Sequence, residues 1–149
     1  MNKMEIRNVD SLDPKVLWLI RRTFLRFEAP DYKEEGVNSF FAFLDDTEQM
    51  KQLKMFGAFV KDELVGIIAV NQDFNHVCLF FVKEKFQRQG IGRKLWEYVL
   101  SCSHACTITV HSSPYAVDVY RHFGFYDLDK EQLTDGMRYT PMRFHIKRG

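Results

Sequence analysis

The sequence predicts a mixed α/β (α+β) fold, with a central mixed sheet of about six to seven strands and helices on both faces. Segments of β-strand composition alternate with segments in which apolar residues recur every three or four positions. The run at residues 77–82 is apolar throughout, which is typical of a central strand covered on both sides. The chain has 149 residues, 46% of them hydrophobic, so we expect one core and a single domain over residues 1–149.

The first third of the chain predicts one strand and two helices. Residues 4–9 read as a short strand. Asp13 followed by Pro14 is typical of a helix start, because the carboxylate caps the helix and proline fits its first turn. Pro30 ends this helix, and a second helix ends near residues 45–46. The apolar residues that share one face are Val16, Leu17, Ile20, Phe24 and Phe27 in the first helix, and Val37, Phe40, Phe41 and Leu44 in the second.

The remaining two thirds alternate strands with helices. One helix follows a glycine-bearing turn and runs through Cys102. Another opens at Ser113-Pro114 and is capped by Gly124. The predicted strands are residues 55–61 and 64–71 with a hairpin at 62–63, residues 77–82, residues 107–111, and a closing pair at 125–127 and 138–147 around a turn at 134–136.

Composition excludes several classes of function. The 21 Lys and Arg against 20 Asp and Glu leave a net charge of +1, so we expect neither nucleic acid nor a membrane as partner. No apolar run approaches the length of a membrane span, and we expect a cytoplasmic protein. The cysteines, Cys78, Cys102 and Cys106, are odd in number and lack zinc-site spacing, so we expect reduced thiols and no metal.

The turn Gln87–Lys94 indicates an anion site. Gly90 and Gly92 let an anion approach the backbone, and the amides that open the following helix have no internal partner. A tight turn that only caps the helix is the alternative. Two nucleotide-binding patterns fail here, because Leu95 stands where a dinucleotide site needs its third glycine and no P-loop pattern is present.

The turn resembles the signature of the GNAT superfamily of acyl-CoA-dependent N-acyltransferases, which Gln87, Gly90 and Gly92 match. Residues 116–125, with Tyr120 followed by Gly-Phe, resemble a second block of that superfamily, and the order of elements agrees over essentially the whole chain. The resemblance implies acetyl-CoA as cosubstrate. Its implied contacts are the turn amides for the pyrophosphate (Arg88, Gln89, Gly90, Ile91, Gly92 and Arg93), Gln87, the backbone of Phe81 and Val82 for the pantetheine arm, and Ser113 where the family often has Asn.

The resemblance also implies that an uncharged amine attacks a thioester and passes through a tetrahedral intermediate. Tyr120 matches the family's general acid, although it also lies on an apolar helix face and could be a core aromatic. His76 or His111 could serve as the base, or each could simply end a strand. Glu28 and Asp31 are further candidates. The acceptor region by resemblance contains Phe27, Glu28, Asp31 and Tyr32.

The sequence therefore predicts an N-acetyltransferase that acts on a primary amine of a small molecule or a peptide. A non-catalytic acyl-CoA-binding regulatory domain is the alternative. The acceptor, an acyl group other than acetyl, and a homodimer all remain open.

Overall fold

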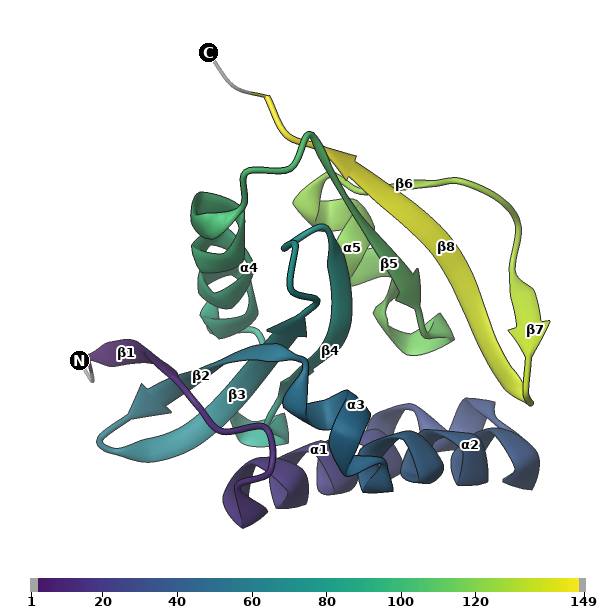
Figure 1. The fold of residues 1–149 in the computed structure, drawn as a ribbon, viewed down its shortest axis with the longest axis horizontal. Helices are drawn as coiled ribbons and strands as arrows, with labels where there is room; N and C mark the ends of the chain where they lie inside the picture. Colours follow the sequence, from purple (N-terminus) through teal and green to yellow (C-terminus); the bar gives the residue numbers. More distant parts are fainter. Residues whose placement is uncertain (1–2, 148–149) are drawn as a thin grey trace.

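The computed structural model describes residues 3–147, which form one eight-stranded mixed sheet with helices on both faces (Figure 1). The strand order is β1-β2-β3-β4-β5-β8-β6, and β7 pairs with β8. This confirms the predicted fold class. The strands are β1 (Met4–Asn8), β2 (Lys54–Val60), β3 (Glu63–Val70), β4 (His76–Val82), β5 (Thr107–Ser112), β6 (Tyr126–Asp127), β7 (Gln132–Thr134) and β8 (Met137–His145), and the α-helices are α1 (Pro14–Phe27), α2 (Glu34–Asp45), α3 (Thr47–Lys51), α4 (Ile91–Cys102) and α5 (Val117–Phe123).

Helices α1 and α2 cover one face of the sheet. Asp13 caps α1 by accepting a hydrogen bond from the Lys15 amide at 2.9 Å, as its position before proline predicts. The rings of Phe24 and Phe40 stack at 3.8 Å between centroids and join the two helices. Both rings are buried against the apolar side chains of β3 and β4, so burial of this face fixes the carboxyl end of α1 beside the sheet.

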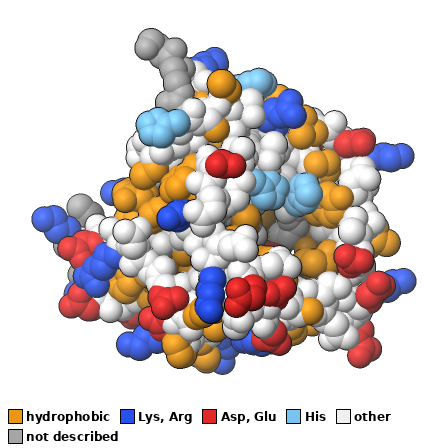
Figure 2. Space-filling model, in the orientation of Figure 1, with side chains coloured by type: hydrophobic (Ala, Val, Ile, Leu, Met, Phe, Trp, Pro, Cys, Tyr) orange, Lys and Arg blue, Asp and Glu red, His pale blue; other side chains and the backbone are white. Residues whose placement is uncertain are grey.

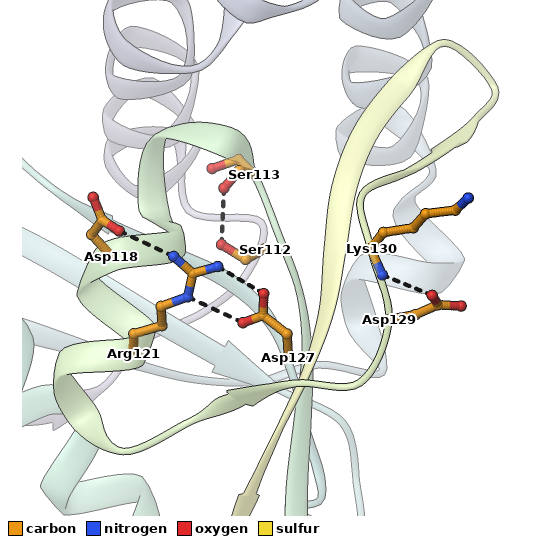
Figure 3. Close-up of polar contacts among 7 residues, drawn as sticks. All are labelled: Ser112, Ser113, Asp118, Arg121, Asp127, Asp129 and Lys130. Carbon is orange, nitrogen blue, oxygen red and sulfur yellow. Dashed lines mark hydrogen bonds and ion pairs between the residues drawn. The ribbon is translucent and has the colours of Figure 1, made fainter.

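Helices α4 and α5 cover the opposite face. Trp96 of α4 is buried, and its ring contacts those of Phe125 and Phe144. Arg121 of α5 bonds to the Asp127 carboxylate at 3.1 and 2.7 Å, and it also pairs with Asp118 (Figure 3). These contacts hold the short helix α5, and with it Tyr120, against the end of the sheet.

The parallel strands β4 and β5 separate after a short region of pairing. Their register contains the pairs His76↔Thr109 and Val77↔Val110, and Figure 1 shows the two strands diverging beyond that point. The Lys83 amide bonds to Val65 in β3. Because successive residues turn their backbone groups to opposite sides, Val82 faces the opening between β4 and β5, whereas Phe81 faces β3. Backbone groups of β4 are therefore available inside the fold.

The structure contains an α-helix and a strand that the sequence did not predict, and one turn lies at a different position. Helix α3 and strand β7 are new, and β7 rather than β6 forms the hairpin with β8. The turn between β2 and β3 is centred on Lys61 and Asp62, one residue earlier than predicted, with φ angles of 51° and 64°. Two adjacent positive φ angles are typical of a type I′ hairpin turn. The last helix begins with a 3₁₀ turn, Pro114–Ala116, and α5 starts at Val117.

The start of α2 packs against the β7–β8 turn. A Cβ on Gly36 would lie 2.3 Å from the Gly136 carbonyl oxygen, so the two backbones touch. The Ser39 hydroxyl donates to the Asp135 carbonyl at 2.7 Å. These contacts place the start of α2 beside the β7–β8 turn, although the two segments are about 100 residues apart in the sequence. Among residues 3–147, no helix has the length and apolar character that crossing a bilayer requires.

Candidate functional site

Two cavities meet where β4 and β5 separate. The turn-side cavity, about 620 Å³, opens onto the β4–α4 turn, and the histidine-side cavity, about 430 Å³, is lined by His76 and His111. Figure 2 shows histidine side chains gathered beside a hollow in this face of the molecule. Both volumes suit small organic ligands. The residues that line both cavities are Glu28, Phe80, Phe81, Ala116 and Tyr120.

The turn-side cavity ends at the amino terminus of α4. Gly90 is the N-cap residue, with φ 84°, and no side chain caps the helix. The first turn contains no acidic residue, but it contains Arg93 and Lys94. Cations at this end of a helix oppose its dipole, so an anion held there would relieve both the uncapped amides and the positive charge. Arg88, with φ 63°, also lines this cavity.

The two glycines of the turn have different roles. Gly90 has the left-handed conformation that favours glycine, and a Cβ there would meet no atom within 4 Å. A Cβ on Gly92 would make ordinary contact with Phe80 at 3.5 Å. The Ile91 side chain is buried in the core, so it could contribute only its amide to a ligand. The Gln89 side chain donates to the Lys85 carbonyl at 3.0 Å and thereby holds the turn.

A chain of contacts crosses the opening beside β4. The Gln87 amide group donates to the Val82 carbonyl at 2.9 Å and accepts from the Tyr115 hydroxyl at 3.0 Å. The Tyr115 ring stacks on Phe27 at 4.9 Å between centroids. Gln87 therefore engages the Val82 carbonyl and leaves the Val82 amide as a backbone donor that faces the opening.

Glu28 lies at the junction of the cavities because it is the C-cap residue of α1. Its side chain forms no ion pair within residues 3–147. Burial raises the pKa of Glu28 from 4.5 to about 7, the Ser113 hydroxyl lowers it, and the charge of Asp31 raises it. A carboxyl group with this pKa can accept a proton at neutral pH.

Ser113 lies on the other side of the junction from its predicted place. It lines the histidine-side cavity, whereas the predicted cofactor residues around Gly90 line the turn-side cavity. Its side chain is 8% exposed, and its Oγ makes no hydrogen bond of standard geometry to any described atom, although it is near enough to lower the pKa of Glu28. Figure 3 shows this hydroxyl turned away from the Arg121 cluster. A buried hydroxyl without a partner is costly unless a ligand satisfies it.

Tyr120 is 5% exposed, and its ring edge contacts Phe80 and Phe125. Burial raises its pKa, and the charges of Glu28 and Cys78 raise it further. The phenol is therefore protonated over the whole working range of pH. Tyr120 belongs to the core cluster and also lines the two cavities, and its role as a general acid stays a prediction.

His76 and His111 lie edge to face, 5.1 Å apart between ring centroids. The Thr109 hydroxyl donates to the Asn75 carbonyl at 3.3 Å, so it accepts from His76 Nδ1 at 2.7 Å. Burial and the neighbouring His111 lower the pKa of His76 to about 4, and burial lowers that of His111. The lowered pKa makes each ring a weak proton acceptor, which disfavours both histidines as the base.

The predicted acceptor residues separate into different places. Phe27 lines the turn-side cavity, and Tyr32 lines the histidine-side cavity, where its hydroxyl donates to the Arg138 carbonyl at 3.3 Å. Asp31 lines neither cavity, and its carbonyl accepts from Arg138 at 3.2 Å. Within the described part of the chain, no three His, Cys, Asp or Glu side chains cluster to hold a metal ion. Cavity residues that the sequence did not indicate include Ser39, Asp135, Arg138 and Tyr139.

Comparisons with known proteins identify the fold. A family model described as an acetyltransferase (GNAT) domain matches residues 28–146. The GCN5-related N-acetyltransferase from Rhodopseudomonas palustris has a TM-score of 0.80 and 16% identity, with 97% of each chain covered. The PaiA N-acetyltransferase from Thermoplasma acidophilum, solved with coenzyme A, has a TM-score of 0.74 and 18% identity, with 96% of this chain and 99% of the other covered. An aminoglycoside 6′-N-acetyltransferase solved with coenzyme A has a TM-score of 0.65 and 12% identity, with 97% and 98% covered. No curated protein sequence matches significantly.

Proposed function

The chain belongs to the GNAT acetyltransferase family, and on that premise we propose that it transfers an acetyl group from acetyl-CoA to a primary amine of a small molecule or peptide. The observation that carries the proposal is the junction of the two cavities at Glu28 and Tyr120. One cavity ends at uncapped helix amides, which suit a phosphate. The other is a separate space for an acceptor, so two substrates could meet at the shared wall.

The turn-side cavity fits coenzyme A in its chemistry. The α4 amides and the side chains of Arg88 and Arg93 would hold the pyrophosphate, because backbone donors and positive charge both favour that anion. The Val82 amide, which faces the opening, would bind a carbonyl group of the pantetheine or acetyl portion. Acetyl-CoA would supply a thioester whose carbonyl carbon an uncharged amine can attack.

Glu28 is the proposed general base. An ammonium has no lone pair, so a group at the acceptor end must first remove a proton. With a pKa of about 7, Glu28 is partly ionised at neutral pH and can attract the ammonium before it takes the proton. No other acidic residue lines both cavities, within the described residues.

Tyr120 and Val82 are proposed to stabilise the charge that develops during the reaction. The Val82 amide would donate to the carbonyl oxygen as it becomes negative. The Tyr120 hydroxyl, which stays protonated because burial raises its pKa, would donate to the sulfur as the thiolate leaves. Two neutral donors around the reacting group need no rearrangement during the step.

A turnover assay on a panel of amines tests this function. Thiol release from acetyl-CoA that depends on an added amine supports the proposal. The alternative, a non-catalytic acyl-CoA-binding domain, predicts a thermal shift with coenzyme A and no thiol release with any amine or peptide. The absence of any thermal shift with coenzyme A would contradict both, and would leave the turn as a helix cap.

A further inference from the structure

Within residues 3–147, the acidic and basic side chains that line the histidine-side cavity do not form ion pairs with one another. Glu28 lies at its inner end, and Asp135, from the β7–β8 turn, also lines it. Neither carboxylate forms an ion pair with a described side chain. Arg138 is the arginine that lines this cavity, among the residues described, and three N–H groups of its guanidinium donate to atoms outside the cavity's carboxylates.

Glu131, which does not line the cavity, neutralises Arg138. Arg138 Nε and Nη2 donate to the two oxygens of Glu131 at 2.9 and 3.1 Å, and Nη1 donates to the Asp31 carbonyl at 3.2 Å. A bidentate ion pair of this kind fixes the guanidinium plane and offsets its positive charge. The cavity therefore presents the carboxylates of Glu28 and Asp135 to a ligand, whereas the guanidinium of Arg138, its lining cation among residues 3–147, is already paired with Glu131.

The inner end of the cavity has a second feature that calls for a ligand. The buried Ser113 hydroxyl forms no hydrogen bond of standard geometry among residues 3–147, and it lies near enough to Glu28 to lower the pKa of that carboxyl. Ser113 Oγ can accept from an N–H group while Glu28 bears the opposite charge to an ammonium. Together they offer acceptor atoms to the hydrogens of one amino group.

The middle of the cavity suits an apolar or aromatic body. Phe40 and Phe43 line it, and Tyr139 stacks on His111 at 4.5 Å between centroids. The two histidine rings are neutral at neutral pH, so they can contact an uncharged body without repelling it. His76 Nε2 is left as a hydrogen-bond acceptor, because Nδ1 donates to Thr109.

We infer that the acceptor is a primary amine on an apolar or aromatic body that carries no carboxylate, so a decarboxylated amine is accepted and the corresponding α-amino acid is refused. This inference rests on the proposed function. A carboxylate next to the reacting amino group would enter a cavity that contains Glu28 and Asp135 and whose lining arginine, Arg138, is paired with Glu131, and such like-charge contact is unfavourable.

Matched substrate pairs test the inference. The pairs are phenethylamine with phenylalanine and tyramine with tyrosine, assayed by thiol release from acetyl-CoA. We expect kcat/KM to be at least about 100-fold higher for phenethylamine than for phenylalanine, since Glu28 and Asp135 would repel the carboxylate of phenylalanine. Equal efficiency for phenylalanine and phenethylamine would overturn the inference.

Two variants sharpen the test. Glu131→Gln releases Arg138 and should raise kcat/KM for phenylalanine roughly tenfold, with phenethylamine changed by less than about twofold. Ser113→Ala should raise KM for phenethylamine roughly fivefold, because one hydrogen bond to the amine is lost. An unchanged preference in Glu131→Gln together with an unchanged KM in Ser113→Ala would contradict the charge and contact assignments.

Calorimetry with coenzyme A present separates this inference from the proposed function. If no amine supports turnover but phenethylamine binds and phenylalanine does not, the proposed function fails and the inference on the cavity stands. If neither compound binds and neither is acetylated, the inference fails.

Discussion

Glu28, which caps α1, and Tyr120, on α5, line the same two cavities, and the charge of Glu28 raises the pKa of Tyr120. The two residues are 92 positions apart in the sequence and reach the junction from opposite faces of the sheet. An ionised Glu28 opposes ionisation of the phenol, so it helps to keep Tyr120 in the protonated state that the proposed reaction needs.

Tyr120→Phe should lower kcat about 100-fold and leave coenzyme A affinity unchanged, because it removes one hydroxyl without altering the buried ring. Steady-state kinetics and a calorimetric titration with coenzyme A check the two halves of this prediction. Tyr126→Phe, at an exposed position, is the matched control. Full activity in Tyr120→Phe would remove the hydroxyl from the mechanism.

Gly90→Ala should weaken coenzyme A binding and destabilise the fold by about 1–2 kcal/mol, because alanine is strained at φ 84°. Gly92→Ala should bind coenzyme A normally, since its Cβ makes ordinary contact with Phe80 and lies in a helix. Thermal unfolding and coenzyme A titration of both variants make the comparison. Equal losses in the two variants would contradict the distinct roles assigned to these glycines.

His76→Gln should raise KM for the amine roughly threefold to tenfold and leave the pH dependence of kcat/KM near pH 7 unchanged. The reason is that the pKa of His76 is lowered to about 4, so its ionisation lies outside that range. The pH profile of the variant measures this directly. If the pH dependence of kcat/KM near pH 7 disappears in His76→Gln, then His76 rather than Glu28 is the base, which the sequence analysis left open.

Glu28→Gln should stabilise the protein at alkaline pH. The folded pKa of about 7 lies above the ordinary 4.5, so the folded state binds a proton more tightly, and stability falls as pH rises between these values. Above pH 7 the cost of the buried charge is about 2 kcal/mol, discounted because the side chain is partly solvated. We expect Tm to rise by a few degrees at pH 8 and little at pH 4.5.

The control for this stability measurement is Glu97→Gln, an exposed position on α4. It should leave Tm unchanged at both pH values. If the Tm of Glu28→Gln at pH 8 is equal to or below that of the parent protein, then the ionised Glu28 side chain does not destabilise the fold as its burial implies.

Patterns local in the sequence predicted the fold well. Asp13-Pro14, the apolar run before the turn, and Gly90 each act through neighbours along the chain, so their consequences can be read from spacing. Helix α3 was missed because five residues carry little periodicity. Strand β7 was missed because it has three residues and depends on its pairing with β8.

The acceptor side of the site could not be predicted from spacing. Asp135 joins the cavity through the contact of Gly36 with Gly136, and that contact depends on the tertiary fold. The neutral state of His76 and the raised pKa of Glu28 both arise from burial, which the local sequence does not encode. Ser113 is a cofactor contact by resemblance only, and that assignment stays a prediction; in the structure it lies near Glu28 and lines the histidine-side cavity.

The most direct test of the proposed junction is the pH dependence of kcat/KM for phenethylamine in the parent protein and in Glu28→Gln. In the parent protein we expect kcat/KM to rise with pH and to level off above about pH 7. In Glu28→Gln we expect kcat/KM to be lower by roughly 100-fold or more, without this pH-dependent rise. A Glu28→Gln variant that retains both the rate and the rise near pH 7 would contradict the role of Glu28 as the base.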